Sequence, residues 1–277
     1  MLTKETFIQL RDFIYERTGI YFTENKMYLM ENRLVNRLNE LGLSSFEDYY
    51  FYLKYGNEKT KTELLNLYDA VTTNETSFFR NPQQFDAFRT IVIKDYLENG
   101  QNTTFGLRIW SAACSTGEEP YTIAIVLLEL MEYLKKNIPF SIYATDISPR
   151  VLESAKTGIY SEYSMRGVSD NIKKKYFTLT KEKNYKIKED VKKFVRFDFM
   201  NLMDQEAYRL YRNMDTIFCR NVLIYFDEKA KRKVLENLYE CLKPGGFLIL
   251  GYAETLHQQR YGFRPLLFPG TIIYQKG

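Results

Sequence analysis

Apolar side chains recur at helical spacing throughout the first seventy or so residues. The first run contains Phe7, Leu10 and Ile14 on one face. Gly19 ends this run, because glycine is the usual residue just beyond a helix end. Three more helices are predicted, over about 25–41, 45–55 and 60–71. No strand pattern interrupts these helices, so residues 1–72 are predicted to form a small all-helical domain.

Beyond residue 72 the pattern changes to short apolar strands that alternate with helices. Strands are predicted over about 107–111, 140–145, 216–219 and 247–252. Helices are predicted over about 84–97, from 120, from Pro149 and over 227–241. Such alternation indicates βαβ units and a mostly parallel sheet with helices on both faces. The predicted fold class is therefore α/β, with a sheet domain over 73–277.

The alternation is lost between Gly158 and Arg196. Short β-like pieces in this stretch carry nine lysines, namely Lys173, Lys174, Lys175, Lys181, Lys183, Lys186, Lys188, Lys192 and Lys193. We interpret residues 158–196 as a small β-subdomain inserted into the sheet domain.

Composition and charge exclude several kinds of chemistry. The chain has one histidine, His257, and three widely spaced cysteines, so zinc catalysis and histidine-based triads are not expected. The odd number of cysteines and the absence of a CxxC pair favour reduced thiols and a cytoplasmic protein. No stretch approaches the roughly 18 apolar residues of a membrane span, so no membrane insertion is expected. A net charge of +4 is too small to indicate a nucleic-acid partner.

The candidate chemistry begins where the first predicted strand ends, in the segment Trp110–Tyr121. Small residues make a tight turn before a helix, which lets a ligand approach the backbone closely. Ala113 and Ser115 stand where glycine is expected for pyrophosphate binding. Glu118 and Glu119 stand where phosphates need a clear approach. The segment therefore favours a cofactor with hydroxyl groups and a positive charge.

A second acid, Asp146, follows the next predicted strand. An acid in this position typically accepts hydrogen bonds from ribose hydroxyls. The alternative interpretation is that Asp146 merely caps the following helix.

Five segments, in order and with matching spacing, resemble the CheR-type chemoreceptor glutamate methyltransferases, which use S-adenosylmethionine (SAM). The segments are Thr72–Arg80, Trp110–Tyr121, Ala144–Ser148, Phe197–Leu202 and Phe218–Asp227. The resemblance covers essentially the whole chain. It implies a Rossmann-like SAM-methyltransferase fold with a seven-stranded sheet, whose last strand at about 271–275 is antiparallel.

The resemblance also implies a set of cofactor-binding residues. Residues from the interdomain segment would close over SAM, acids would bind its amino or ribose groups, and residues after two strands would flank the adenine and the reacting end. In that order they are Asn74, Thr76 and Arg80; Glu118 and Asp146; and Asn201, Leu202, Arg220 and Asn221. Ala113, in the small-residue turn, is expected to bind the cofactor as well.

Two of the residues are expected from the resemblance to face the acceptor. Arg80 matches an arginine beside the transferred methyl group, and Tyr225 matches a tyrosine that faces the incoming carboxylate. A guanidinium can hold a carboxylate by two parallel hydrogen bonds. Two alternatives stay open: Arg80 or Arg220 could pair with Asp198 or Asp215 instead, and Tyr225 could belong to the core.

The expected partner is the acidic helical methylation region of a chemoreceptor. Lys26, Arg33 and Arg37 lie on one line of the second helix and could face this region; the alternative is a solvated helix face. Family members that capture a receptor pentapeptide have a longer, glycine-containing turn than residues 178–183, so no such tether is expected. A SAM methyltransferase with another acceptor and a SAM-binding module without catalysis are the alternative functions.

Overall fold

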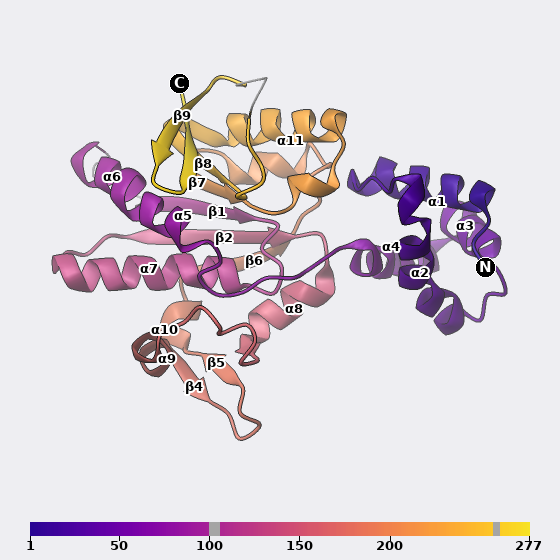
Figure 1. Ribbon diagram of the computed structural model, residues 1–277, viewed down its shortest axis with the longest axis horizontal. Coiled ribbons are helices and arrows are strands. Elements are labelled where there is room, and N and C mark those ends of the chain that lie inside the picture. The colour runs from indigo at the N-terminus through magenta and orange to yellow at the C-terminus, as the bar shows by residue number, and fades with distance from the viewer. Residues whose placement is uncertain (100–105, 257–260) are drawn as a thin grey trace.

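The computed structural model describes residues 1–99, 106–256 and 261–277. The one histidine of the sequence, His257, lies outside these ranges. Figure 1 shows an all-helical domain at one end, a central sheet with helices on both faces, and a small second sheet that projects from the central domain. Within the described residues no helix is long and apolar enough to cross a bilayer.

The helical domain contains four helices, as the periodicity predicts. They are α1 (Lys4–Thr18), α2 (Met27–Leu41), α3 (Phe46–Tyr55) and α4 (Glu58–Val71), with a 3₁₀ turn, η1 (Glu24–Lys26), before α2. Thr3 and Ser45 accept N-cap hydrogen bonds, and Gly19 at φ 73° ends α1 in the left-handed region. The apolar stripes meet in one core that includes Leu10 and Leu34.

The central sheet has seven strands in the order β6-β2-β1-β7-β8-β10-β9. Their bounds are β1 (Leu107–Ala112), β2 (Phe140–Asp146), β6 (Val195–Phe199), β7 (Met214–Cys219), β8 (Leu242–Leu250), β9 (Phe263–Phe268) and β10 (Thr271–Lys276). The strands from β6 to β8 in this order pair in parallel, and β10 is antiparallel to both of its neighbours. The predicted α/β class and antiparallel last strand are confirmed.

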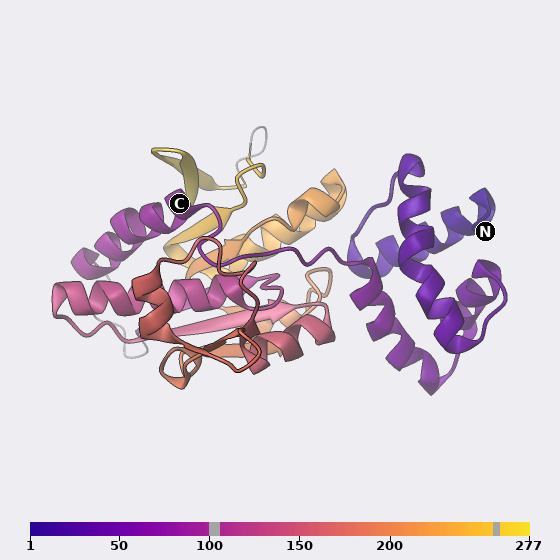
Figure 2. The same cartoon turned by 60° about the horizontal axis from the view of Figure 1, so that its bottom comes forward.

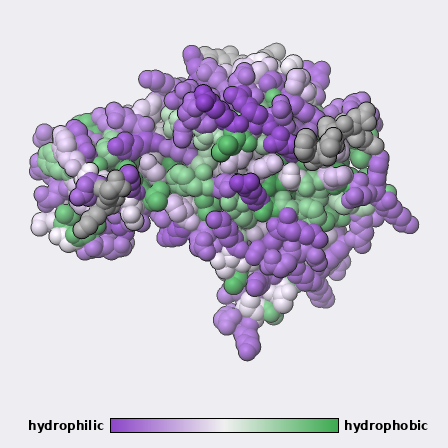
Figure 3. Space-filling view, turned by 180° about the vertical axis from the view of Figure 1, so that it is seen from behind, coloured by the Kyte–Doolittle hydropathy of each residue, from purple (hydrophilic) through white to green (hydrophobic). Residues whose placement is uncertain are grey.

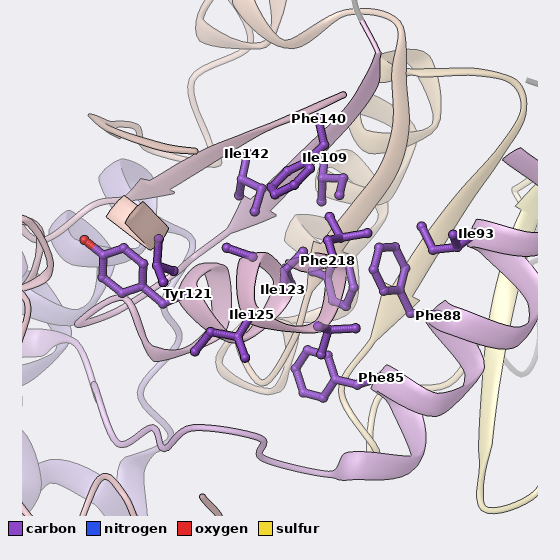
Figure 4. Packing of buried hydrophobic residues seen from close by; sticks show 14 of the residues in the cluster. Phe85, Phe88, Ile93, Ile109, Tyr121, Ile123, Ile125, Phe140, Ile142 and Phe218 are labelled. Carbon is purple, nitrogen blue, oxygen red and sulfur yellow. The ribbon is translucent and has the colours of Figure 1, made fainter. Parts of the chain in front are cut away.

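Helices cover both faces of this sheet, and each face has its own core. One face is covered by α5 (Pro82–Ala87), the π-helical segment η2 (Phe88–Ile93), α6 (Lys94–Asn99), α7 (Glu118–Leu134) and α8 (Pro149–Thr157). Figure 4 shows Phe85 and Phe88 against Phe218 and Ile109 of the sheet. The other face packs on α11 (Glu228–Cys241) and the 3₁₀ turn η3 (Ala207–Tyr211), around Trp110.

The insertion is a three-stranded antiparallel sheet of order β3-β5-β4. Its elements are β3 (Ile159–Tyr160), α9 (Asp170–Tyr176), β4 (Phe177–Leu179), β5 (Tyr185–Ile187) and α10 (Glu189–Lys192). It forms the mostly hydrophilic lower projection in Figure 3.

Several element boundaries need correction. The predicted helix over 84–97 is three segments with a π-helical centre, and α7 begins at Glu118 rather than near 120. Two strands, β6 and β9, were not predicted, and β6 takes Val195 and Arg196 out of the insertion. The predicted turn at 243–246 lies inside β8, because the pairing with β7 shifts register between Met214 and Thr216.

Candidate active site

A pocket lies between the helical domain and the ends of the parallel strands. It encloses about 1000 Å³ with its open mouth included, a volume suited to a nucleoside-sized ligand. The lining comes from the end of α1, the interdomain segment and the loops after β1, β2, β6 and β7. It comprises Thr18, Ile20, residues 71–77, Arg80, Phe85, residues 113–115, Glu119, Asp146, Ile147, residues 200–202, residues 220–222, Tyr225 and Phe226.

The loop from β1 to α7 curves closely round one side of this pocket. Ala113 and Ser115 have φ values of 64° and 50°, and Gly117 has 92°. A Cβ at Gly117 would lie 2.9 Å from the Cβ of Ala155 and 3.1 Å from the Tyr160 hydroxyl. The small residues therefore allow a backbone path that larger side chains would obstruct.

Asp146 fixes this loop and still faces the pocket. Its Oδ2 accepts the Ser115 amide N–H at 2.8 Å, and its Oδ1 accepts the Ser148 amide N–H at 3.0 Å. The N-cap of α8 is Ser148, so the interpretation of Asp146 as merely the helix cap is wrong. Burial raises the pKa of Asp146, and the hydrogen bonds from these amides oppose that shift. A carboxylate has about four acceptor positions, so acceptors remain for ligand hydroxyls.

The structure brings Glu119, and not Glu118, to the pocket. Glu119 accepts the Ser111 hydroxyl at 2.7 Å and pairs with Arg220 at 2.8 Å. Glu118 is buried away from the lining and accepts the Thr116 hydroxyl at 2.6 Å. Desolvation raises the pKa of Glu118. Glu118 was predicted to lie at the site, and its neighbour Glu119 lines the pocket instead.

Arg220 has a structural role, but with different partners from those weighed in the sequence. It is buried and pairs with Glu119, while its Nε donates to Gln84 Oε1 and its Nη2 to the Arg80 carbonyl, both at 2.5 Å. The carboxylates weighed as partners go elsewhere, because Asp198 pairs with Arg196 and Asp215 with Lys243.

Arg80 keeps its guanidinium at the pocket. Its Nη1 donates to the Glu75 carbonyl at 2.9 Å. Within the part of the chain that the structure describes, no carboxylate forms an ion pair with it. This arrangement leaves N–H groups of a fixed cation for a ligand.

The remaining predicted residues also gather at the pocket. Asn74, Thr76, Leu202, Asn221 and Tyr225 line it, so Tyr225 is not simply a core side chain. Asn201 lines it too, but its amide side chain donates to the Arg17 carbonyl at 2.5 Å and accepts the Met203 amide at 2.9 Å.

The three basic residues of the predicted stripe have different surroundings. Lys26 lies in η1 and is exposed. Arg33 donates to the Val71 carbonyl and to the Thr73 hydroxyl, and so holds the interdomain segment. Arg37 pairs with Glu63 at 2.6 Å and with Glu40, and its side chain is only 14% exposed. Arg37 thus pairs with acids of its own domain, and its contact with a receptor stays a prediction.

The sequence interpretation did not find every residue of the site. Thr18 and Ile20 from the helical domain line the pocket, although their sequence pattern indicates only a helix end. The acid pair at 118–119 did mark the position of Glu119, but the phase of the helix decides which acid faces the pocket.

These features define a SAM-dependent methyltransferase: a seven-stranded α/β sheet of this order, a small-residue loop after β1 and a carboxylate at the end of β2. The protein-family model described as "CheR methyltransferase, SAM binding domain" matches residues 74–268. The model named "CheR methyltransferase, all-alpha domain" matches residues 5–72. The chain therefore belongs to the CheR methyltransferase family.

Relatives support this assignment along the whole chain. "Chemotaxis protein methyltransferase 2" of Vibrio cholerae is 36% identical over 276 residues, which cover 100% of this chain and 94% of the relative. "Chemotaxis protein methyltransferase" of Borreliella burgdorferi is 38% identical over 258 residues, 92% of this chain and 89% of the relative. A module without catalysis is not favoured by these matches.

Proposed function

We propose that this chain transfers the methyl group of SAM to glutamate carboxylates of a bacterial chemoreceptor, in the cytoplasm. The observation that carries the proposal is that one pocket contains both Asp146 and Arg80. Asp146 is a carboxylate at the position that typically binds ribose hydroxyls. Arg80 has no carboxylate partner among the described residues. Relatives named chemotaxis methyltransferases support the pathway.

The cofactor side of the pocket suits SAM. Asp146 offers acceptors for ribose hydroxyls, and the loop at Ala113–Ser115 brings the backbone close to the ligand. Leu202 and Glu119 line the same pocket, so Leu202 would offer an apolar contact to the adenine and Glu119 a carboxylate to the amino group. Asn201 also lines the pocket, and its side chain is held by hydrogen bonds to the backbone of Arg17 and Met203.

The acceptor side needs alignment more than proton abstraction. SAM supplies an activated methyl group on a sulfonium, and a glutamate side chain is already an anion near neutral pH. Arg80 and Tyr225 both line the pocket, so Arg80 would hold this carboxylate and Tyr225 would face it. Positioning and exclusion of water then carry the transfer, which agrees with a chain that has one histidine.

The helical domain is proposed to meet the receptor. Lys26 is its exposed cation from the predicted stripe, and charge complementarity with an acidic helical bundle would set the register of docking. Arg33 contributes indirectly, because it holds the segment at Val71–Thr73 that lines the pocket.

Labelled SAM and a receptor cytoplasmic fragment test the proposal. The expected result is base-labile label on glutamate residues of the fragment. Asp146→Ala should abolish labelling at low SAM, whereas Asp170→Ala, at the exposed start of α9, should not change it. Base-stable label, or label only on RNA or a small molecule, would contradict the glutamate acceptor.

A further inference from the structure

Glu254 is a buried carboxylate that lies outside the pocket and follows the end of β8. Its Oε2 accepts the amide N–H groups of Asn221 and Gly251, both at 2.7 Å, and its Oε1 accepts the Ile224 amide at 3.2 Å. No ion pair in the described parts of the chain includes it. Burying a carboxylate is costly unless hydrogen bonds compensate it, and here backbone amides supply them.

Two of these amides belong to the loop that carries the acceptor-facing tyrosine. Asn221 has φ 59°, a left-handed conformation that persists in a non-glycine residue only where the surroundings hold it. The 3₁₀ turn η4 (Leu223–Tyr225) begins after Val222, which makes no side-chain cap hydrogen bond. Glu254 therefore does for η4 what an N-cap side chain normally does, although it lies 30 residues away from Ile224 in sequence.

The same loop is held on its other side by Glu119. That carboxylate pairs with Arg220, the residue just before Asn221. Asn221 and Tyr225 both line the pocket, whereas Glu254 does not. The direct connection between Glu254 and the pocket lining is its pair of hydrogen bonds to the backbone amides of Asn221 and Ile224.

We propose that Glu254 is a positioning residue for methyl transfer, which fixes the loop 221–225 so that Tyr225 faces the acceptor carboxylate. This inference rests on the proposed function, because it assigns Tyr225 to the acceptor side. The competing explanation is that Glu254 only closes the turn at Gly251, where its own amide donates to the Gly251 carbonyl at 2.8 Å.

Glu254→Gln separates the two explanations. Glutamine has one carbonyl oxygen and one donor group in place of two acceptor oxygens, so it leaves at least one of the amides without a partner. The kcat for methylation of the receptor fragment should fall about 10- to 100-fold, the cost of misplacing a reacting group by about 1 Å. The dissociation constant for S-adenosylhomocysteine should stay within about threefold. Glu236→Gln, an exposed position on α11, is the matched control.

A double-mutant cycle with Tyr225→Phe tests the route of the effect. If Glu254 acts through the tyrosine loop, the two losses in kcat are not additive in free energy. Additive losses, an unchanged kcat, or a loss explained by weaker cofactor binding would overturn the proposal. Should Glu254→Gln not fold, Glu254→Asp, which keeps the charge but is shorter by one methylene, takes its place in both measurements.

Hydrogen exchange distinguishes a failure of this inference from a failure of the proposed function. Without any receptor, Glu254→Gln should speed exchange in a peptide that covers 221–226 and leave one that covers 115–121 unchanged. Unchanged exchange at 221–226 would show that the carboxylate does not hold the loop. An inactive wild type in the receptor assay would contradict the proposed acceptor, whatever the exchange result.

Discussion

At the residue scale, the Asp146 carboxylate both holds the loops around the pocket and places a titratable acid in its lining. Asp146 is 6% exposed, and its carboxylate joins the loop after β1 to the start of α8 through two amide hydrogen bonds. Burial disfavours its charged form and raises its pKa, although the amides favour ionisation. The ionised form accepts hydrogen bonds from a ligand, and the protonated form loses part of this capacity.

Cofactor affinity should therefore fall as the pH falls through the raised pKa of Asp146. The effect on protein stability has the opposite sign, because the pKa of Asp146 is higher in the folded than in the unfolded state. Asp146 therefore contributes fully to the free energy of unfolding below its unfolded-state pKa. This contribution is lost as pH rises through its folded-state pKa. Calorimetric titration of S-adenosylhomocysteine at several pH values should show this fall in affinity towards low pH, a pH slope of the affinity, for the wild type. Asp146→Asn should bind about tenfold or more weakly and without the slope; a slope that persists in the variant would assign it to another group.

Arg80 gives a second test at this scale. Its side chain donates to one neighbouring carbonyl, so Arg80→Ala should weaken cofactor binding and abolish methyl transfer while changing the free energy of unfolding by less than about 1 kcal/mol. Arg80→Lys keeps the positive charge and loses the planar guanidinium. If the charge alone mattered, Arg80→Lys would be as active as the wild type; we expect lower activity than the wild type, because lysine cannot bind a carboxylate by two parallel hydrogen bonds. Unchanged cofactor affinity and transfer in Arg80→Ala would remove Arg80 from the site.

The acids at the start of α7 show why the sequence could locate the site without assigning each residue. Successive residues on a helix differ by about 100° in direction, so only one of Glu118 and Glu119 can face the pocket. The sequence placed the helix start near 120, whereas the structure begins α7 at Glu118 after the left-handed Gly117. That phase is set by a backbone turn against Ala155 and Tyr160, which are distant in sequence.

At the scale of elements, the Arg220 guanidinium joins three parts of the fold. It follows β7, pairs with Glu119 of α7, and donates to Gln84 of α5. Gln84 in turn donates to the Leu250 carbonyl at the end of β8 at 2.5 Å. Glu119 and Arg220 of the pocket lining therefore belong to a polar network that connects β7, α7, α5 and β8.

Arg220→Ala should destabilise the protein by about 3–5 kcal/mol, because it leaves a largely buried Glu119 without its cation. Urea unfolding measures this change. Arg209→Ala, which breaks an exposed pair with Glu206, is the matched control and should cost no more than about 1 kcal/mol. Equal losses for the two variants would show that the network does not contribute to stability.

The elements that the sequence predicted are those whose signals are local. The helices of the first domain have periodic apolar faces and caps at Thr3, Gly19 and Ser45. The edge strands β6 and β9 are partly exposed and lack a continuous apolar run, so they were missed. The turn signal at 243–246 was real, but the strand continues past it because β7 pairs on both sides.

At the scale of the whole molecule, the helical domain completes the pocket as well as offering a surface to a partner. Tyr15 donates to Asp227 Oδ2 at 2.9 Å, the Tyr21 amide donates to the Tyr225 carbonyl at 3.0 Å, and Asn201 donates to Arg17. Figure 2 shows the segment after α4 running from the helical domain along the sheet domain. Local sequence patterns do not report contacts of this range, so the contribution of Thr18 and Ile20 was not predicted.

The small inserted sheet should not capture the C-terminal pentapeptide of a receptor. Its edge strand β4 has three residues, which offer few backbone groups for an added strand. The following turn is closed by the Thr180 amide donating to the Asn184 carbonyl at 2.7 Å, and it contains no glycine. Calorimetric titration of the pentapeptide should give no binding heat, while S-adenosylhomocysteine in the same sample shows that the protein is folded. Micromolar peptide binding would contradict this prediction, and receptor recognition would then involve both ends of the molecule.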